Sequence, residues 1–515
     1  MNLFRPASAC SLIGMLTVSA FGAAPKASAP KPRPPDSPAW IEAKAMLARE
    51  GETLDITQLL TPGVLDKTNF CAIPNLKDLA ITLGGKSTAG DPGKRRLVLK
   101  AMGQPFEATD QPSLGRGPDE GQRADLVVWA RYLTRHRLAL LPQASADVGK
   151  VVADALDLAF PALPHLVRAG VLPYSIFTPA PLQRGVPSPV EGLPVVDFPA
   201  LQGVATLLAL RAIAAIEGNN YPDAVLNVSA LHKLTIAFAN EPTVASQFQA
   251  IASTSYGNNA AWHLFLAQSA NEEHLRIEQA ALDAIDFRAS LLRTWRCEMA
   301  IFIGAIEATE AVDGGPSVAQ VFFPGDTSGN SGNLIADLLV TGPPQRVGEA
   351  KAAYVTHVYE HCIKPLKTAG LAGFLHEAES NAAAFAPLPI EVARTQPGVF
   401  VGRSFLRQIG RLPQVAVQAQ LTTDQARIAC AIECFYVAQK HLPTALGELS
   451  PNYMKAVPAD LLDGQPMRYR VIEKGRYQLW SIGANRHDDS GTGDDVVWSY
   501  SERDEEAKRT QAPRP

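Results

Sequence analysis

Apolar residues recur at helical spacing along most of this chain. At 124–269, 272–309 and 347–364 they return every three or four positions, which is typical of amphipathic helices. A shorter segment, 38–50, has the same pattern. No fixed period repeats along these segments, so the sequence predicts a mainly α fold, built as an irregular helical array.

The clearest pair of helices lies at 201–217 and 223–239. The turn between them contains Gly218, Asn219, Asn220, Tyr221 and Pro222. A helix, such a turn and a second helix resemble one tetratricopeptide-type hairpin. Arrays of this kind present concave surfaces that suit peptides or partner proteins.

A different pattern begins near residue 421. Thr422 and Gln425 have the spacing of a capping box, which predicts that a helix starts there. The residues that give this helix an apolar face are Ile428, Ile432 and Phe435. Pro443 cannot continue a helix, so the helix should end just before it.

Two strand-like runs follow at 467–472 and 476–482, with a hairpin turn at 473–475. A third short run lies at 496–498. The segment 421–500, called the C-terminal module below, is therefore predicted to be a small α/β unit. It should consist of a helix followed by a three-stranded antiparallel sheet.

The N-terminal residues 1–24 have the features of a secretory signal: Arg5, a short apolar stretch at 10–21, and small residues after it. A proline-rich linker follows at 25–38, and a charged, disordered tail is predicted at 501–515. No later apolar run is long enough to span a membrane. The chain should therefore be exported to the periplasm or beyond, and an uncleaved signal would anchor it.

Between these ends, a mixed and irregular region at 39–123 precedes a helical domain at 124–420. The net charge of -4 gives no reason to expect nucleic acid as a partner. After the signal the cysteines are Cys71, Cys297, Cys362, Cys430 and Cys434. Their odd number and scattered positions argue against a disulfide framework, and the last two should share a buried helix face.

One set of residues in the C-terminal module keeps a characteristic order and spacing. Its members are Leu442, Pro443, Leu446, Leu449, Pro458, Asp460, Gly464, Pro466, Tyr469, Tyr477, Leu479, Ser481 and Gly483. Over about 75 residues the module resembles the globular part of the major pseudopilins of type II secretion. A pseudopilin has a long apolar helix directly ahead of that part, whereas some 420 residues of other sequence precede it here.

The resemblance also implies a calcium ion in the last loop. Calcium binds about six to eight oxygen ligands, and an acidic loop rich in glycine can supply them. The family's ligand positions fall at Asn485, Asp488, Asp494 and Asp495, although the family tends to have aspartate in place of Asn485. A solvated acidic turn without metal is the alternative.

The mature chain further resembles a group of exported bacterial proteins whose activity is uncharacterised. The shared features are Asn69-Phe70-x-x-x-Pro74, alanine-rich helices around 209–234, Glu241-Pro242 and the C-terminal module. This resemblance supports the fold and implies no activity.

One motif offers an enzymatic alternative. His357, Glu360 and His361 fit H-x-x-E-H, in which two histidines four residues apart bind zinc and the glutamate activates water. A third ligand is needed as well. The candidates are Glu377, Glu391 and Glu433.

These observations predict an exported, non-enzymatic interaction or scaffold protein of the cell envelope, with unknown protein partners and a module that binds calcium. The first alternative is a zinc-dependent hydrolase that uses the motif at 357–361. The second is an accessory component of a type II secretion or pilus-like system.

Overall fold

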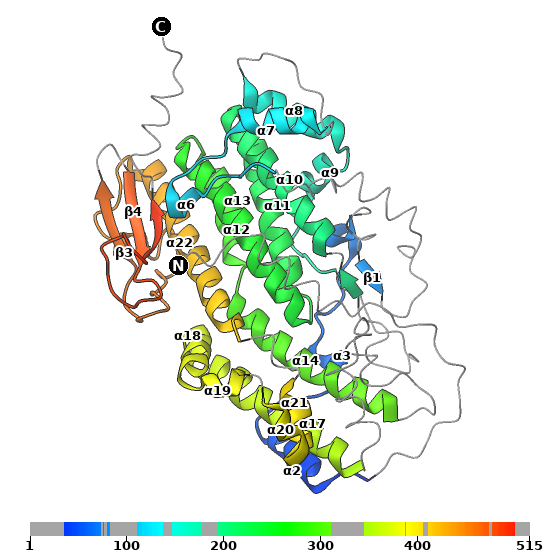
Figure 1. Ribbon diagram of the computed structural model, residues 1–515. Coiled ribbons are helices and arrows are strands. Elements are labelled where there is room, and N and C mark those ends of the chain that lie inside the picture. Colours follow the sequence, from blue (N-terminus) through cyan, green and yellow to red (C-terminus); the bar gives the residue numbers. More distant parts are fainter. Residues whose placement is uncertain are drawn as a thin grey trace.

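The computed structural model describes residues 35–73, 76, 80–82, 111–136, 147–177, 194–196, 198–310, 344–386, 388–404, 410–472 and 476–499. The fold is mainly helical and carries a small C-terminal three-stranded antiparallel sheet, which confirms the predicted class (Figure 1). The predicted signal, the hairpin turn at 473–475 and the tail at 501–515 lie outside the described residues. Within the described ranges, no helix is long and apolar enough to cross a membrane.

The helical body is formed by the middle of the chain. Its helices are α7 (Leu126–Arg135), α8 (Val148–Ala159), α9 (Leu163–Ala169), α10 (Phe198–Glu217), α11 (Tyr221–Ala239), α12 (Val244–Leu266), α13 (Glu272–Asp283) and α14 (Phe287–Glu310). The predicted hairpin is present as α10 and α11, which pack together. Arg211 fixes it to α8, because the buried guanidinium binds Asp157 at 2.6 and 2.8 Å and Asp223 at 2.6 Å.

The helical pattern at 272–309 does not form one continuous helix. Two helices, α13 and α14, occupy this stretch, with a break at residues 284–286. Asp286 accounts for the restart, since its carboxylate accepts the Ala289 N–H at 2.9 Å in the manner of an N-cap. Apolar periodicity continues across the break, which is why the pattern alone did not show it.

A second group of helices packs against α14 at the lower end of the view in Figure 1. It comprises α2 (Pro38–Arg49), α3 (Ile56–Leu59), α17 (Pro344–Val358), the π-helical turn η4 (Tyr359–Ile363), α18 (Lys364–Ser380), α19 (Ala382–Phe385), α20 (Ile390–Thr395) and α21 (Pro397–Ser404). Glu52, which lies between α2 and α3, joins this group to α14. Its buried carboxylate binds Arg296 of α14 at 2.6 and 3.0 Å and Lys367 of α18 at 2.9 Å.

Two short segments before the body are held by pairing that the sequence did not predict. Strands β1 (Ala80–Thr82) and β2 (Pro194–Val196) form a two-stranded antiparallel ladder. Next to them, the 3-10 turns η1 (Asp66–Thr68) and η2 (Phe70–Ala72) flank Asn69, whose amide donates to the Ile176 carbonyl at 2.8 Å and accepts the Ile176 N–H at 3.0 Å. The Asn69 motif therefore has a structural role.

The C-terminal module begins within α22 (Leu412–Gln439). It contains the 3-10 turn η6 (Leu446–Leu449) and strands β3 (Arg468–Ile472), β4 (Arg476–Ser481) and β5 (Val496–Ser499), in the sheet order β3-β4-β5. The predicted helix start at Thr422 is wrong, because α22 begins at Leu412. Thr422 lies inside the helix and its hydroxyl donates to the Ala419 carbonyl at 3.1 Å. The predicted domain boundary at residue 421 thus falls within one continuous helix.

The module and the body share a single apolar core. On β5, Trp498 is fully buried, and its ring lies 6.2 Å from that of Phe265 on α12. The short helix α6 (Gly117–Glu120) contacts both α12 and β5, and lies beside the sheet in Figure 1. Asn259 of α12 fastens this segment, accepting the Gly117 N–H at 3.0 Å and donating to the Leu114 carbonyl at 2.9 Å.

Candidate functional site

The loop predicted to bind calcium folds over the outer face of the sheet. The Trp480 indole N–H donates to Asp488 at 2.9 Å, and the Ser490 N–H donates to the same oxygen at 2.9 Å. The bond from Trp480 and the bond from Ser490 lower the pKa of Asp488. Asp488 is therefore an ionised acceptor that fixes the loop to β4.

Asp495 closes the loop on itself. Its carboxylate accepts the Gly491 N–H at 2.7 Å and the Asp489 N–H at 3.3 Å. Asn485 donates from its amide to Asp489 at 2.9 Å. Two of the four predicted ligands, Asp488 and Asp495, thus face backbone N–H donors.

Asp494 contributes to the loop through its backbone. At Gly483, where φ is +66°, an added Cβ would meet the Asp494 carbonyl oxygen at 2.0 Å, so this position requires glycine. The Asp494 side chain is exposed. Within the described residues, no three His, Cys, Asp or Glu side chains are gathered so that they could hold a metal ion. Calcium binding by this loop stays a prediction.

The residues of the H-x-x-E-H motif lie at the junction of α17 and η4. The rings of His357 and His361 are 4.4 Å apart, and His361 Nδ1 lies 2.7 Å from Glu377 Oε1. Of the three candidate third ligands, Glu377 is thus adjacent to the motif, whereas Glu433 lies on α22 and accepts a hydrogen bond from the Tyr477 hydroxyl of β4 at 3.3 Å. Glu360, the group that would activate water, instead forms an ion pair with Lys364 at 2.7 Å.

Local helix geometry explains this arrangement. Pro365 has no N–H to donate to the carbonyl four residues earlier, and its ring crowds that carbonyl, so the helix widens into the π-helical turn. Burial, followed by the charges of His361 and Arg403, lowers the pKa of His357 to about 4, and a hydrogen bond to the Ala384 backbone offsets only part of this shift. His357 is consequently a neutral imidazole near pH 7.

A buried pair that the sequence did not reveal lies at the centre of the body. His232 Nε2 of α11 is 2.7 Å from Glu278 Oε1 of α13, and neither side chain is exposed to solvent. Among the described residues, His232 Nδ1 and Glu278 Oε2 have no hydrogen-bond partner. Gly257 of α12 makes room for the imidazole, because an added Cβ would lie 2.6 Å from the ring. Such an enclosed pair joins helices and does not reach a substrate.

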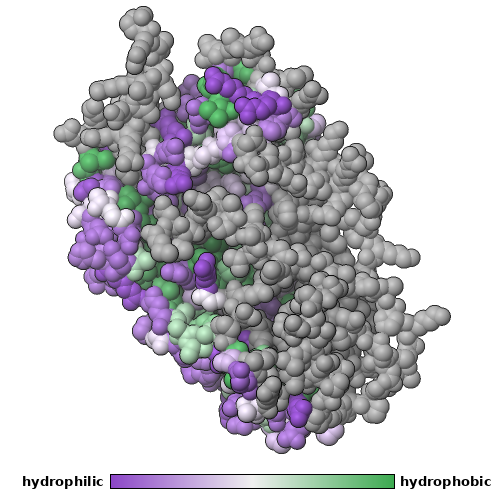
Figure 2. All heavy atoms as spheres, viewed as in Figure 1, coloured by the Kyte–Doolittle hydropathy of each residue, from purple (hydrophilic) through white to green (hydrophobic). Residues whose placement is uncertain are grey.

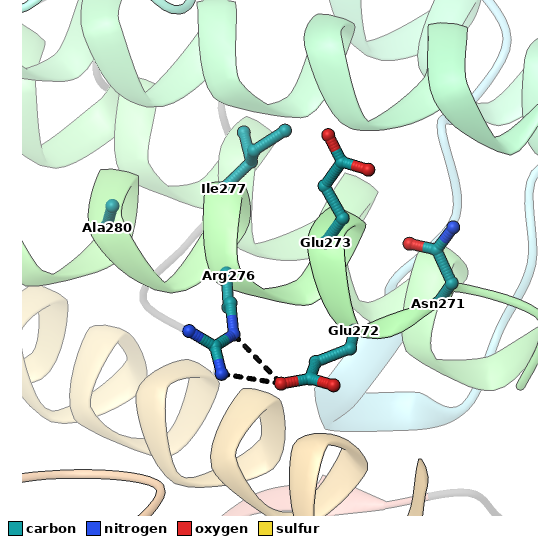
Figure 3. Close-up of a pocket in the computed structure, with 6 residues that line it drawn as sticks. All are labelled: Asn271, Glu272, Glu273, Arg276, Ile277 and Ala280. Carbon is teal, nitrogen blue, oxygen red and sulfur yellow. Dashed lines mark hydrogen bonds and ion pairs between the residues drawn. The ribbon is translucent and has the colours of Figure 1, made fainter.

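A surface hollow lies at the start of α13. It is lined by Asn271, Glu272, Glu273, Arg276, Ile277 and Ala280 (Figure 3). Glu272 and Arg276 point toward each other and pair at 2.5 and 3.0 Å, while Glu273 and Ile277 lie on the opposite side of the helix (Figure 3). The hollow is open to solvent, so it does not enclose a small molecule.

The two edges of the C-terminal sheet differ. The β5 edge contacts α6, and Gln425 of α22 donates to the Val496 carbonyl at 2.7 Å. Strand β3 pairs only with β4 among the described residues, and its opposite edge has no strand beside it. In the view of Figure 2, the coloured surface on the side of the sheet is mainly hydrophilic.

On β3, one arginine is neutralised and another is not. Arg468 binds Asp460 at 2.7 Å and also pairs with Asp463. Asp460 is buried and also accepts hydrogen bonds from the Ser481 hydroxyl and from the Ile482 N–H. Arg470 is exposed, and its guanidinium lies 5.3 Å from the centre of the Trp480 ring.

Comparison of the chain with protein-family models, with curated proteins and with solved structures gives no match.

Proposed function

We propose that the protein is an exported, non-enzymatic scaffold of the cell envelope whose helical body holds the C-terminal module in place for a protein partner. The observation that carries this proposal is the helix α22. It packs against α12 and α13 of the body and also contacts β4 and β5 of the sheet. A module attached in this way is displayed in one fixed orientation.

Two further features support display of the module. Segment 113–117 is bound to Asn259 and, with α6, fills the space between α12 and β5. The exposed side of the sheet carries the acidic loop, which is closed by its own hydrogen bonds and therefore has a defined shape. The secretory features of residues 1–24 support export, and the resemblance to pseudopilins supports a role beside a secretion or pilus-like system.

The zinc-dependent hydrolase ranks second. One observation favours it, since His361 contacts Glu377, a candidate third ligand. Against it, Glu360, the group that would activate water, forms an ion pair with Lys364. Zinc analysis of the purified chain tests this alternative, because a hydrolase requires about one zinc per chain that is lost in His361→Ala.

Site-specific photo-cross-linking in the native host tests the scaffold proposal. A benzophenone side chain is introduced at Val471 or Asp494 of the module, or at Leu158 of α8, which is 80% exposed and serves as the control. We expect one discrete protein adduct from a module position and none from the control. No adduct at either module position, or equal adducts at all three, would contradict display of the module.

A further inference from the structure

We infer that the outer edge of β3 is the recognition surface of the module, and that it takes an extended segment of the partner, with an acidic residue at its centre, as an added strand. This inference rests on the proposed function, because it names where and how the partner binds. It needs three properties of β3: free backbone groups, an accessible apolar side chain and a charge that selects the added strand.

The backbone groups come from the sheet topology. In an antiparallel pair, alternate residues direct their N–H and C=O groups toward the partner strand and the others direct them away. The residues of β3 that face away from β4 have no strand to bond with among the described parts of the chain. Within the described parts of the chain, α6 and Gln425 occupy the β5 edge, which leaves β3 as the edge where a strand can be added.

The side chains of β3 add selectivity. Arg468, Arg470 and Ile472 share one face of the strand, since side chains alternate. Arg468 is already neutralised by Asp460 and Asp463, whereas no carboxylate in the described residues forms an ion pair with Arg470. Arg470 is held over Trp480 at the edge, where an aspartate or glutamate of an added strand would lie opposite it.

The same charges argue against a second copy of this chain as the occupant. An antiparallel pair of β3 strands centred on Arg470 places this residue opposite its own copy. A pair centred on Tyr469 places Arg468 opposite Arg470. Like charges directly opposite each other are unfavourable, so the edge disfavours self-pairing and favours an acidic partner. Val471, which is 50% exposed, offers apolar contact on the other face of the strand.

Peptide binding to the purified mature chain tests the inference. The probe is a labelled seven-residue peptide of alternating threonine and valine with a central aspartate and blocked ends, and its binding is followed by fluorescence anisotropy. A matched peptide with central lysine should bind at least about fivefold more weakly. Arg470→Glu should reverse this order, and Arg470→Lys should preserve it. Circular dichroism confirms that both variants are folded.

Three outcomes would overturn the inference. The first is that the aspartate peptide does not bind. The second is that a version methylated on alternate backbone nitrogens binds equally well, which excludes strand addition. The third is that the two central residues bind alike and Arg470→Glu changes nothing. If cross-links then form at Asp494 but not at Val471, the scaffold proposal stands and only the edge is refuted. If neither position gives an adduct, both proposals fail.

Discussion

Protonation of His263 should weaken the fold at acidic pH. The side chain lies on α12, is 3% exposed, and bonds to the Leu114 backbone beside the segment that α12 holds against β5. Burial, followed by the positive charge of Arg123, lowers the pKa of His263 to about 3. The hydrogen bond to the Leu114 backbone favours the protonated ring but does not outweigh burial, and among the described residues Nε2 has no hydrogen-bond partner.

The direction and size of the effect follow from linkage. In the unfolded chain His263 has a pKa of 6.5, so between pH 6.5 and about 3 the unfolded state binds more protons than the folded state. The free energy of unfolding therefore decreases as pH falls through this window, by about 1.4 kcal/mol per pH unit. Acidification from about pH 6.5 to about pH 5 should cost roughly 2 kcal/mol through this one residue.

Chemical unfolding followed by tryptophan fluorescence tests this prediction with His263→Gln. Glutamine can still donate to the Leu114 carbonyl, but it does not titrate. The loss of stability between about pH 7.5 and pH 5 is compared in the two proteins, and other titrating groups cancel because both proteins contain them. We expect the variant to lose about 2 kcal/mol less. Equal losses in both proteins would refute a neutral, buried His263.

Three further predictions concern packing, charge and metal. Gly117→Ala should destabilise the protein by about 1–3 kcal/mol in thermal unfolding, because the new Cβ would lie 2.2 Å from the Asn259 side-chain oxygen. The control is Gly447→Ala, which should leave stability unchanged because no atom lies within 4 Å of its new Cβ. Glu52→Gln should lower the free energy of unfolding by about 2 kcal/mol or more, because Arg296 and Lys367 lose the carboxylate that both of them bind. A change near zero in denaturant titration would show that this buried ion pair does not stabilise the fold. If the acidic loop binds calcium, elemental analysis of the mature chain purified without chelators should find about one calcium per chain, lost when Asp495 is replaced by alanine. Absence of calcium from the intact protein would rule the prediction out.

Local patterns predicted the strands well. β3, β4 and β5 lie within a residue or so of the positions expected from alternation and turn residues, because each strand needs only local signals and one buried face. The start of α22 was missed for a physical reason. Thr422 has the residue type of a cap, but its hydroxyl is satisfied by a carbonyl of the preceding turn, so the helix continues through it.

Contacts between distant segments were beyond the sequence. His232 and Glu278 are 46 residues apart, and nothing in either helix pattern shows that they meet in the core. The acidic loop was located correctly, yet its composition does not reveal whether a carboxylate faces a cation or an N–H group. That distinction depends on the positive φ angles of Gly483, Gly491 and Gly493, which set the path of the loop.

The continuity of α22 has a practical consequence. Residues on nearly every side of this helix are buried, from Leu412 near its start to Phe435 near its end. A fragment that starts at residue 421 would lose the first turns of the helix and would expose to water the side that normally packs on α12 and α13. We therefore expect the fragment to aggregate when expressed alone, and the intact chain to melt in one cooperative step. A pulling force applied to the sheet would reach the body through α22 with no flexible joint between them.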